Sequence, residues 1–208
     1  MKKLKVPALS INILIIILEI IGTAISLTRS GAHSLIYYTV LSNILALVSC
    51  VLYACFLLKG GEPGGAVLLL RYCATVCLSV TFFVVVAVFV PMALPYGTVA
   101  DILYKGPQIY HHLLCPILSF ISFCFFEGGQ LSKRIILIGA LPTLLYVVFS
   151  VTLNILKVIK GPYPFLLVYE QPWYVSVIWF VLIMGFGAAF AALVRLLHNK
   201  FSKKGEVI

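Results

Sequence analysis

Three polar residues, Thr39, Ser42 and Asn43, lie within a stretch of the sequence, residues 35–58, that contains no charged residue. They are three and four residues apart, so a helix through this stretch places all three on one face. In hydrocarbon, a polar side chain needs an internal partner or a water-filled cavity. The spacing therefore predicts that another polar element faces this helix.

The adjacent histidines His111 and His112, followed by Pro116, are the best candidates for that element. A threonine hydroxyl becomes a useful nucleophile when a neighbouring base accepts its proton, and a neutral imidazole suits that task near neutral pH. Asn43, one turn deeper than Thr39, would donate to a developing oxyanion or orient the histidine. The alternative is a threonine bonded to its own helix and a histidine donating to a neighbouring helix.

Pro116 lacks the amide hydrogen that would bond the carbonyl four residues earlier, that of His112. We expect a local opening of the helix here, with room for a polar cavity. Adjacent residues on an α-helix point about 100° apart, so we expect one histidine to face the bundle interior and the other to face headgroups or water. The same divergence disfavours chelation of one metal by both rings. We expect no metal and no cofactor.

The composition identifies a membrane protein. Hydrophobic residues make up 62% of the 208 residues and charged residues only 10%, and the mean hydropathy is +1.15. A soluble domain of this size cannot bury so much apolar surface. Apolar runs of spanning length predict a single all-α transmembrane domain over residues 1–208. We expect a polytopic six-helix bundle with helices at 6–27, 35–58, 66–94, 109–126, 135–156 and 174–197.

The 15 Lys and Arg residues are unevenly distributed, and the positive-inside rule then places both termini in the cytoplasm. The side predicted to be cytoplasmic holds Lys2, Lys3, Lys5, Lys59, Arg71, Lys133, Arg134, Arg195, Lys200, Lys203 and Lys204. The opposite side holds Arg29, Lys105, Lys157 and Lys160. This pattern favours a multi-pass protein of the cell membrane over a nucleic-acid-binding protein. It also makes the helices at 35–58 and 109–126 enter from the outer side, with Thr39 roughly 6 Å deep.

Other polar residues allow two interpretations each. Glu19 is the only acid well inside a predicted span, so it is either functional or a protonated carboxyl bonded to a neighbouring helix. Arg71 lies near the end of its span and is expected to snorkel to the interface. The six cysteines fall inside predicted helices and are expected to pack as small hydrophobic residues. The aromatic fifth loop, around Tyr163 and Phe165, is either an interfacial belt or a lid over an outward-facing pocket.

Three short motifs occur in a fixed order: Tyr38-Thr39 with Ser42-Asn43, a histidine shortly before Pro116, and Tyr163-Pro164-Phe165. This order resembles the androgen-induced family of multispanning membrane hydrolases and its bacterial relatives. The resemblance implies a Thr nucleophile and a His that hydrolyse fatty acid esters of hydroxy fatty acids within the membrane. These residues correspond to Thr39 and to His112 or His111, and the shorter spacing to the proline favours His112. The resemblance assigns no acid.

Two functions are compatible with these residues. The first is an intramembrane Thr/His hydrolase that acts on a lipid or lipid-like ester, a membrane component being its expected partner. Its catalytic residues would be Thr39 with His112 or His111, and its supporting or substrate-binding residues Ser42, Asn43, Glu19, Tyr38, Tyr163 and Phe165. The second is a non-enzymatic lipid-binding or small-solute transport protein that uses the same pocket. In both cases we expect a bacterial plasma membrane protein, and the sequence leaves the oligomeric state undefined.

Overall fold

The computed structural model describes residues 2–202, with side chains from Lys5 onward, and this part of the chain is helical and contains no β-strand. Five of its helices are long and apolar enough to cross a membrane: Lys5–Ile36, Tyr38–Leu58, Gly65–Tyr96, Ile135–Ile155 and Trp173–Phe201. A further apolar helix, Ile109–Phe125, is shorter. The chain is therefore compatible with a multi-pass membrane protein. The predicted cytoplasmic lysines Lys2, Lys3, Lys203 and Lys204 lie outside the described side chains.

The long helices contain segments of different winding. Helix α1 (Lys2–Ser30) continues into the 3₁₀ segment η1 (Gly31–Ile36), and α2 (Tyr38–Leu58) follows. Helix α3 (Gly65–Val84) continues through the π-helical η2 (Val85–Phe89), α4 (Val90–Ala93) and the 3₁₀ turn η3 (Leu94–Tyr96). The short α5 (Val99–Leu103) precedes the π-helical η4 (Ile109–Leu114) and α6 (Cys115–Phe125). Helix α7 (Ile135–Ile155), the 3₁₀ turn η5 (Pro164–Leu166) and α8 (Trp173–Phe201) complete the described chain.

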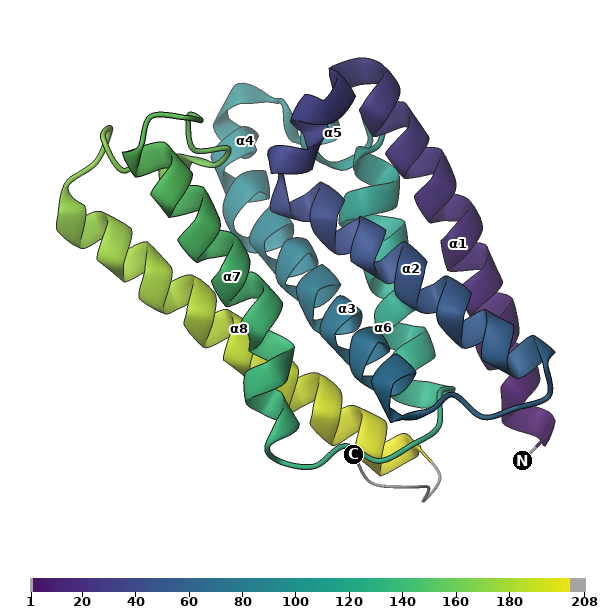
Figure 1. The fold of residues 1–208 in the computed structure, drawn as a ribbon. Coiled ribbons are helices and arrows are strands. Elements are labelled where there is room, and N and C mark those ends of the chain that lie inside the picture. Colours follow the sequence, from purple (N-terminus) through teal and green to yellow (C-terminus); the bar gives the residue numbers. More distant parts are fainter. Residues whose placement is uncertain (1, 203–208) are drawn as a thin grey trace.

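Helix α3 is the centre of the bundle. Each of its residues from Arg71 to Thr81 is buried, and the helix packs against α2, α6, α7 and α8. Figure 1 shows α1 and α2 on one side of it and α7 and α8 on the other. The Tyr72 ring packs in one core cluster with Phe123 of α6 and Ala191 of α8, and its hydroxyl donates to the Ala191 carbonyl at 2.7 Å.

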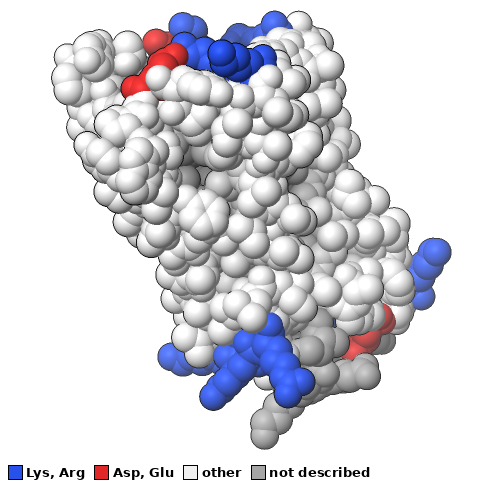
Figure 2. Space-filling model, turned by 60° about the vertical axis from the view of Figure 1, so that its left-hand side comes forward, with Lys and Arg blue, Asp and Glu red and all other residues white. Residues whose placement is uncertain are grey.

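The two ends of the bundle differ from the middle in charge. We call the end formed by segments 31–37, 94–108 and 156–172 the site end, and the opposite end, where α1 begins and α8 ends, the terminal end (Figure 1). On the face shown in Figure 2, the charged residues gather at the two ends and leave an uncharged band between them. That distribution suits a bundle whose middle is surrounded by lipid.

Helix α2 begins at Tyr38, three residues later than predicted. The chain leaves α1 through Gly31, whose φ of +55° favours glycine, and forms the 3₁₀ segment η1 before an extended Tyr37 (φ −85°, ψ 129°). Thr39 is therefore the second residue of α2, whereas a helix starting at residue 35 would make it the fifth. Its position in the first turn matters, because backbone N–H groups there have no acceptor within the helix.

Arg71 does not snorkel, contrary to the sequence-based expectation. Its side chain is fully buried and forms an ion pair with Glu127, which is equally buried (Nη2 to Oε1, 2.6 Å). The Asn12 amide and the Ser122 hydroxyl also donate to this carboxylate, at 3.0 and 2.8 Å. The pair ties α3 to the turn that follows α6. A buried charge requires such a partner, because desolvation of an isolated ion is costly.

Candidate functional site

A polar cavity of about 520 Å³ opens at the site end of the bundle. Its walls come from the end of α1 and from η1, α2, η2, α5, η4 and the fifth loop. It is lined by Thr39 from α2 and by His111 and His112 from η4. The structure therefore brings the predicted alcohol and both predicted imidazoles to one cavity. Tyr163 of the fifth loop also lines it.

Thr39 is held by Tyr163. The Thr39 backbone N–H donates to the Tyr163 phenol oxygen at 3.2 Å, which satisfies one of the free amides of the first helical turn. The two side-chain hydroxyls are 3.3 Å apart. Because the phenol oxygen already accepts from the amide, its own hydrogen can be donated to Thr39 Oγ1. That arrangement leaves the threonine hydrogen free for another acceptor in the cavity.

The phenol of Tyr163 stays a donor because of its surroundings. Burial raises the pKa of Tyr163 above its ordinary value, since the phenolate would lose its solvation. The ring lies against Phe89 at 5.8 Å between centroids and against Phe165 at 5.2 Å. These stacked rings fix the position of the hydroxyl over the start of α2.

The second predicted catalytic group, His112, is oriented by a backbone carbonyl. Its Nδ1 lies 2.7 Å from the Ile102 carbonyl oxygen of α5. A carbonyl only accepts, so we assign the hydrogen of the neutral ring to Nδ1, which leaves the lone pair on Nε2. Such a tautomer can take a proton through Nε2. The ring is 8% exposed, so the expectation that one histidine faces headgroups or water is wrong.

His111, the other imidazole, faces helix α1. Its Nε2 lies 3.9 Å from Glu19 Oε2, and both side chains are almost completely buried. A Cβ atom on Gly22 would lie 2.8 Å from this nitrogen, so the ring passes where only glycine leaves room. His111 Nε2 and the two Glu19 carboxyl oxygens have no nitrogen or oxygen partner within hydrogen-bond distance among the described residues, and the Cys115 thiol lies beside the carboxyl group. The structure thus pairs Glu19 with His111 and leaves it away from Thr39.

The π-helical winding of η4 explains the role of Asn43. The backbone N–H of Cys115 bonds the carbonyl of Tyr110, five residues back, so in this register Pro116 fails to bond the carbonyl of His111. The predicted loss at His112 is therefore wrong by one residue. Asn43 Nδ2 donates to that His111 carbonyl at 3.3 Å and to its own helix at the Thr39 carbonyl, 2.7 Å.

Asn43 consequently has no hydrogen left for an oxyanion. Both amide hydrogens are used by backbone carbonyls, and its Oδ1, which lacks a partner among the described residues, can only accept. Its bond to the His111 carbonyl holds the backbone of η4, and no hydrogen bond joins Asn43 to either described imidazole ring. Ser42 is also turned away from the cavity, since its hydroxyl bonds the Thr39 carbonyl at 2.9 Å and Thr81 at 3.1 Å.

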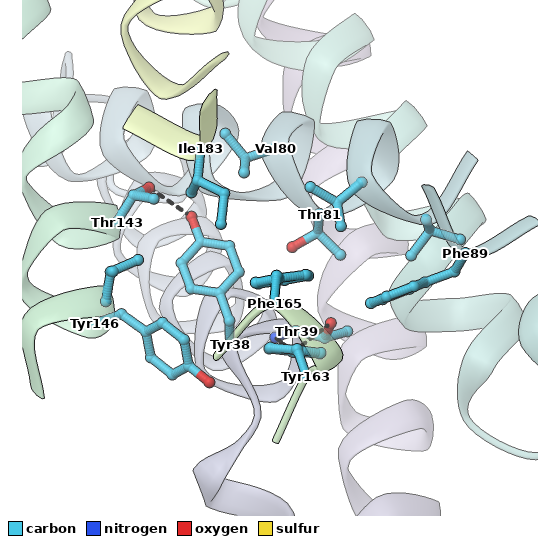
Figure 3. Close-up of a pocket in the computed structure, with 13 residues that line it drawn as sticks. Tyr38, Thr39, Val80, Thr81, Phe89, Thr143, Tyr146, Tyr163, Phe165 and Ile183 are labelled. Carbon is cyan, nitrogen blue, oxygen red and sulfur yellow. Dashed lines mark hydrogen bonds between the residues drawn. The ribbon is translucent and has the colours of Figure 1, made fainter. Parts of the chain in front are cut away.

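An apolar inner cavity of about 30 Å³ adjoins Thr39 on its other side (Figure 3). Thr39, Phe89 and Tyr163 line both cavities. Tyr38 also borders the inner cavity, and its hydroxyl is 2.7 Å from that of Thr143 on α7, as the dashed line in Figure 3 shows. The remaining walls are mostly hydrophobic, with Val80, Val84, Val85, Val147, Phe165 and Ile183, and also include Thr81 and Tyr146.

The fifth loop folds inward at its first half. Phe165 and Leu166 are buried against Val147 and Ile183, which matches a lid over the pocket and contradicts a belt at these positions. The second half is different: Trp173, at the start of α8, is 77% exposed. An interfacial aromatic position is compatible with that end of the loop.

Two features of the site carried no sequence signal. The Ile102 carbonyl that orients His112 is a backbone group of a short helix that we had expected to be loop. The direct contact between Tyr163 and Thr39 joins residues 124 positions apart; the aromatic loop and the motif order singled out the tyrosine, but neither indicated this contact. Comparisons of the chain with family models, with curated proteins and with solved structures gave no match. The resemblance to the androgen-induced family therefore stays a prediction.

Proposed function

We propose that the protein is an intramembrane hydrolase of lipid or lipid-like esters, with Thr39 as nucleophile and His112 as general base. A relationship to the androgen-induced family belongs to the same proposal. The observation that carries it is the shared cavity, which Thr39 and His112 both line: Tyr163 can donate to the threonine hydroxyl and leave its hydrogen free, and His112 Nδ1 lies against the Ile102 carbonyl.

The reaction proceeds in two halves. Thr39 Oγ1 attacks the ester carbonyl carbon while its proton passes to His112 Nε2, and the tetrahedral intermediate collapses as His112 returns that proton to the leaving alcohol. A water molecule then attacks the acyl-threonine, again with His112 as base. This releases the carboxylic acid and restores the hydroxyl. For Tyr163 to stabilise the charge that develops on the carbonyl oxygen, its one hydrogen must first leave Thr39 Oγ1, to which it is donated in the arrangement described above.

The choice of His112 over His111 has a geometric support. His112 bonds through Nδ1 to an acceptor that cannot donate, so its second nitrogen is the free base. His111 directs its Nε2 at Glu19 and Gly22 in the interior. We therefore assign His111 and Glu19 no step in the reaction.

The test is covalent labelling of the purified protein by a fluorophosphonate hydrolase probe. Thr39→Val should abolish labelling, Thr39→Ser should restore it, and His112→Gln should slow it strongly. Thr28→Val is the matched control, because Thr28 bonds carbonyls of its own helix and is exposed outside the cavity. Labelling of Thr39→Val at the wild-type rate would discard this nucleophile.

A non-enzymatic lipid-binding or small-solute transport protein is the second candidate. It is favoured by one observation: within the described chain Thr39 Oγ1 bonds Tyr163 and neither imidazole. Mass spectrometry of lipid co-purified with the protein separates the two. A bound ester that stays intact through long incubation, with Thr39→Val binding it equally well, supports this candidate against the hydrolase.

We further propose that Ile109–Phe125 completes a six-helix bundle with both termini in the cytoplasm of a bacterial cell. This helix of about 26 Å lies with the five longer spans, and the described cations Lys5, Lys59, Lys133 and Arg134 support the orientation. Carboxyl-terminal fusions test it: green fluorescent protein should fluoresce and alkaline phosphatase should be inactive. The reverse pattern would place the carboxyl terminus outside.

A further inference from the structure

An apolar groove of about 700 Å³ runs between α2 and α7. Leu41 and Leu45 of α2 form one wall and Leu145 and Phe149 of α7 the other, while Cys77 of α3 lies at its base. No charged residue lines it. The groove is thus a gap between two candidate membrane spans, closed at the back by the central helix.

The groove opens toward the surroundings of the bundle. Leu41 is 40% exposed, Leu145 60% and Phe149 64%, and all three lie in helices apolar enough to cross a membrane. In a bilayer, such residues contact lipid acyl chains. An uncharged groove of this depth at that position suits a single hydrocarbon chain, because a polar ligand would lose its solvation there.

The groove adjoins the inner cavity beside Thr39. Tyr38 and Tyr146 line both, so the two spaces share one wall. That wall is closed by the 2.7 Å hydrogen bond between the Tyr38 and Thr143 hydroxyls, which joins α2 to α7. At about 30 Å³, the inner cavity holds little more than one water-sized group in this state. A chain therefore reaches Thr39 only when the Tyr38 ring moves aside.

We propose that the groove between α2 and α7 is the binding site and lateral entrance for the acyl chain of a membrane lipid ester, with the Tyr38–Thr143 hydrogen bond as its gate. The proposal rests on the proposed hydrolase function, since it delivers the ester to Thr39. Short water-soluble esters do not need this path, because the polar cavity opens at the site end and reaches the same threonine. The two routes make the proposal testable.

The experiment uses the full chain in phosphatidylcholine vesicles and two fluorogenic esters, an acetate and an oleate. Leu41→Trp fills the groove. Leu52→Trp is its matched control, since Leu52 lies on the same helix, is 39% exposed and does not line the groove. Leu41→Trp should lower the ratio of oleate to acetate hydrolysis about 10-fold or more, and Leu52→Trp should keep the wild-type ratio. Thr143→Val removes the hydrogen bond that closes the gate, so it should raise the ratio of oleate to acetate hydrolysis. A wild-type ratio in Leu41→Trp overturns the proposal.

A second measurement separates this proposal from the hydrolase itself. An oleate analogue with a diazirine on its chain is cross-linked to the protein in the same vesicles, with and without excess oleate ester. Labelling of residues 38–58 and 135–155 that excess ester displaces, and that Leu41→Trp abolishes, supports the groove. If the wild-type protein shows this labelling but hydrolyses neither ester, only the proposed hydrolase function fails. Labelling that no excess ester displaces overturns the groove. So do cross-links between two copies of the chain at these helices.

Discussion

The hydrogen bond from Asn43 to the backbone carbonyl of His111, which Pro116 leaves without its helical partner, can be tested directly. The missing N–H of Pro116 leaves the His111 carbonyl to be satisfied by Asn43, which also holds the Thr39 carbonyl. Asn43→Leu removes both donors and keeps the number and branching of the side-chain heavy atoms. The Thr39 carbonyl keeps the Ser42 hydroxyl as a partner. The His111 carbonyl is left buried without one.

The expected effect follows from that difference. An unsatisfied buried carbonyl costs about 1–3 kcal/mol, and an ordinary hydrogen bond contributes about 0.5–1.5 kcal/mol. Asn43→Leu should therefore lower the free energy of unfolding by about 1–3 kcal/mol. In a Pro116→Ala background, the alanine at position 116 supplies an N–H of its own. In that background, the loss in free energy of unfolding caused by Asn43→Leu should shrink toward the contribution of one ordinary hydrogen bond.

The assay is a double-mutant cycle on the purified protein in detergent, read by thermal unfolding. For a chain of this size about 1 kcal/mol shifts the midpoint by roughly 2–4 °C. The control cycle pairs Pro116→Ala with Asn199→Leu, because Asn199 bonds the Leu131 carbonyl at the terminal end and distant changes add. Additive effects of Asn43→Leu and Pro116→Ala would refute the assignment of Asn43 to the carbonyl freed by the proline.

Three further outcomes test the site and the fold. His112→Gln should lower kcat/KM for an ester by about 10²–10⁴, and an unchanged value would remove it as the base. Tyr163→Phe should lower kcat by about 10²-fold with a small change in KM if the phenol stabilises the transition state; a change confined to KM would limit it to binding. Arg71→Met should lower the free energy of unfolding by about 3–5 kcal/mol, and adding Glu127→Leu should restore most of it. A double variant less stable than the single one would contradict a mutually dependent pair.

Long apolar runs were enough to locate the helices of the bundle, because hydrocarbon tolerates few other structures. The ends were harder to locate. Residues 35–37 are as apolar as the helix they precede, so composition did not reveal the 3₁₀ turn that delays α2 to Tyr38. Arg71 was misjudged for a related reason. Its partner Glu127 lies just after α6 and before Gly128 and Gly129, where the sequence suggests a turn between helices and gives no sign of a buried acid, yet it is 1% exposed.

The residues of the candidate site could be predicted better than the contacts that each of them makes. Thr39 and the two histidines share a cavity, as the polar face of α2 suggested. What each contacts depends on backbone geometry: π-helical winding moves the freed carbonyl by one residue, and a carbonyl of α5 orients His112. Both π-helical segments end two residues before a proline, η2 before Pro91 and η4 before Pro116. That spacing is visible in the sequence, and π-helical turns are frequent at functional sites.

The position of Thr39 between two unlike cavities constrains how an ester would bind. One arm must enter from the apolar side, where the inner cavity of about 30 Å³ admits a chain only once Tyr38 moves aside. The other arm must lie in the polar cavity, where Arg29 and Lys105 line the wall. The leaving alcohol must depart, and the water that releases the acyl group must arrive, through the polar side, because the inner cavity offers hydrocarbon walls. The acyl arm therefore belongs on the apolar side. Lys105 is already paired with Asp101 at 3.0 Å, so Arg29 is the cation with more charge to offer an anionic group on the alcohol arm. For the proposed hydrolase, Arg29→Gln should then raise the KM for such anionic esters more than the KM for neutral ones.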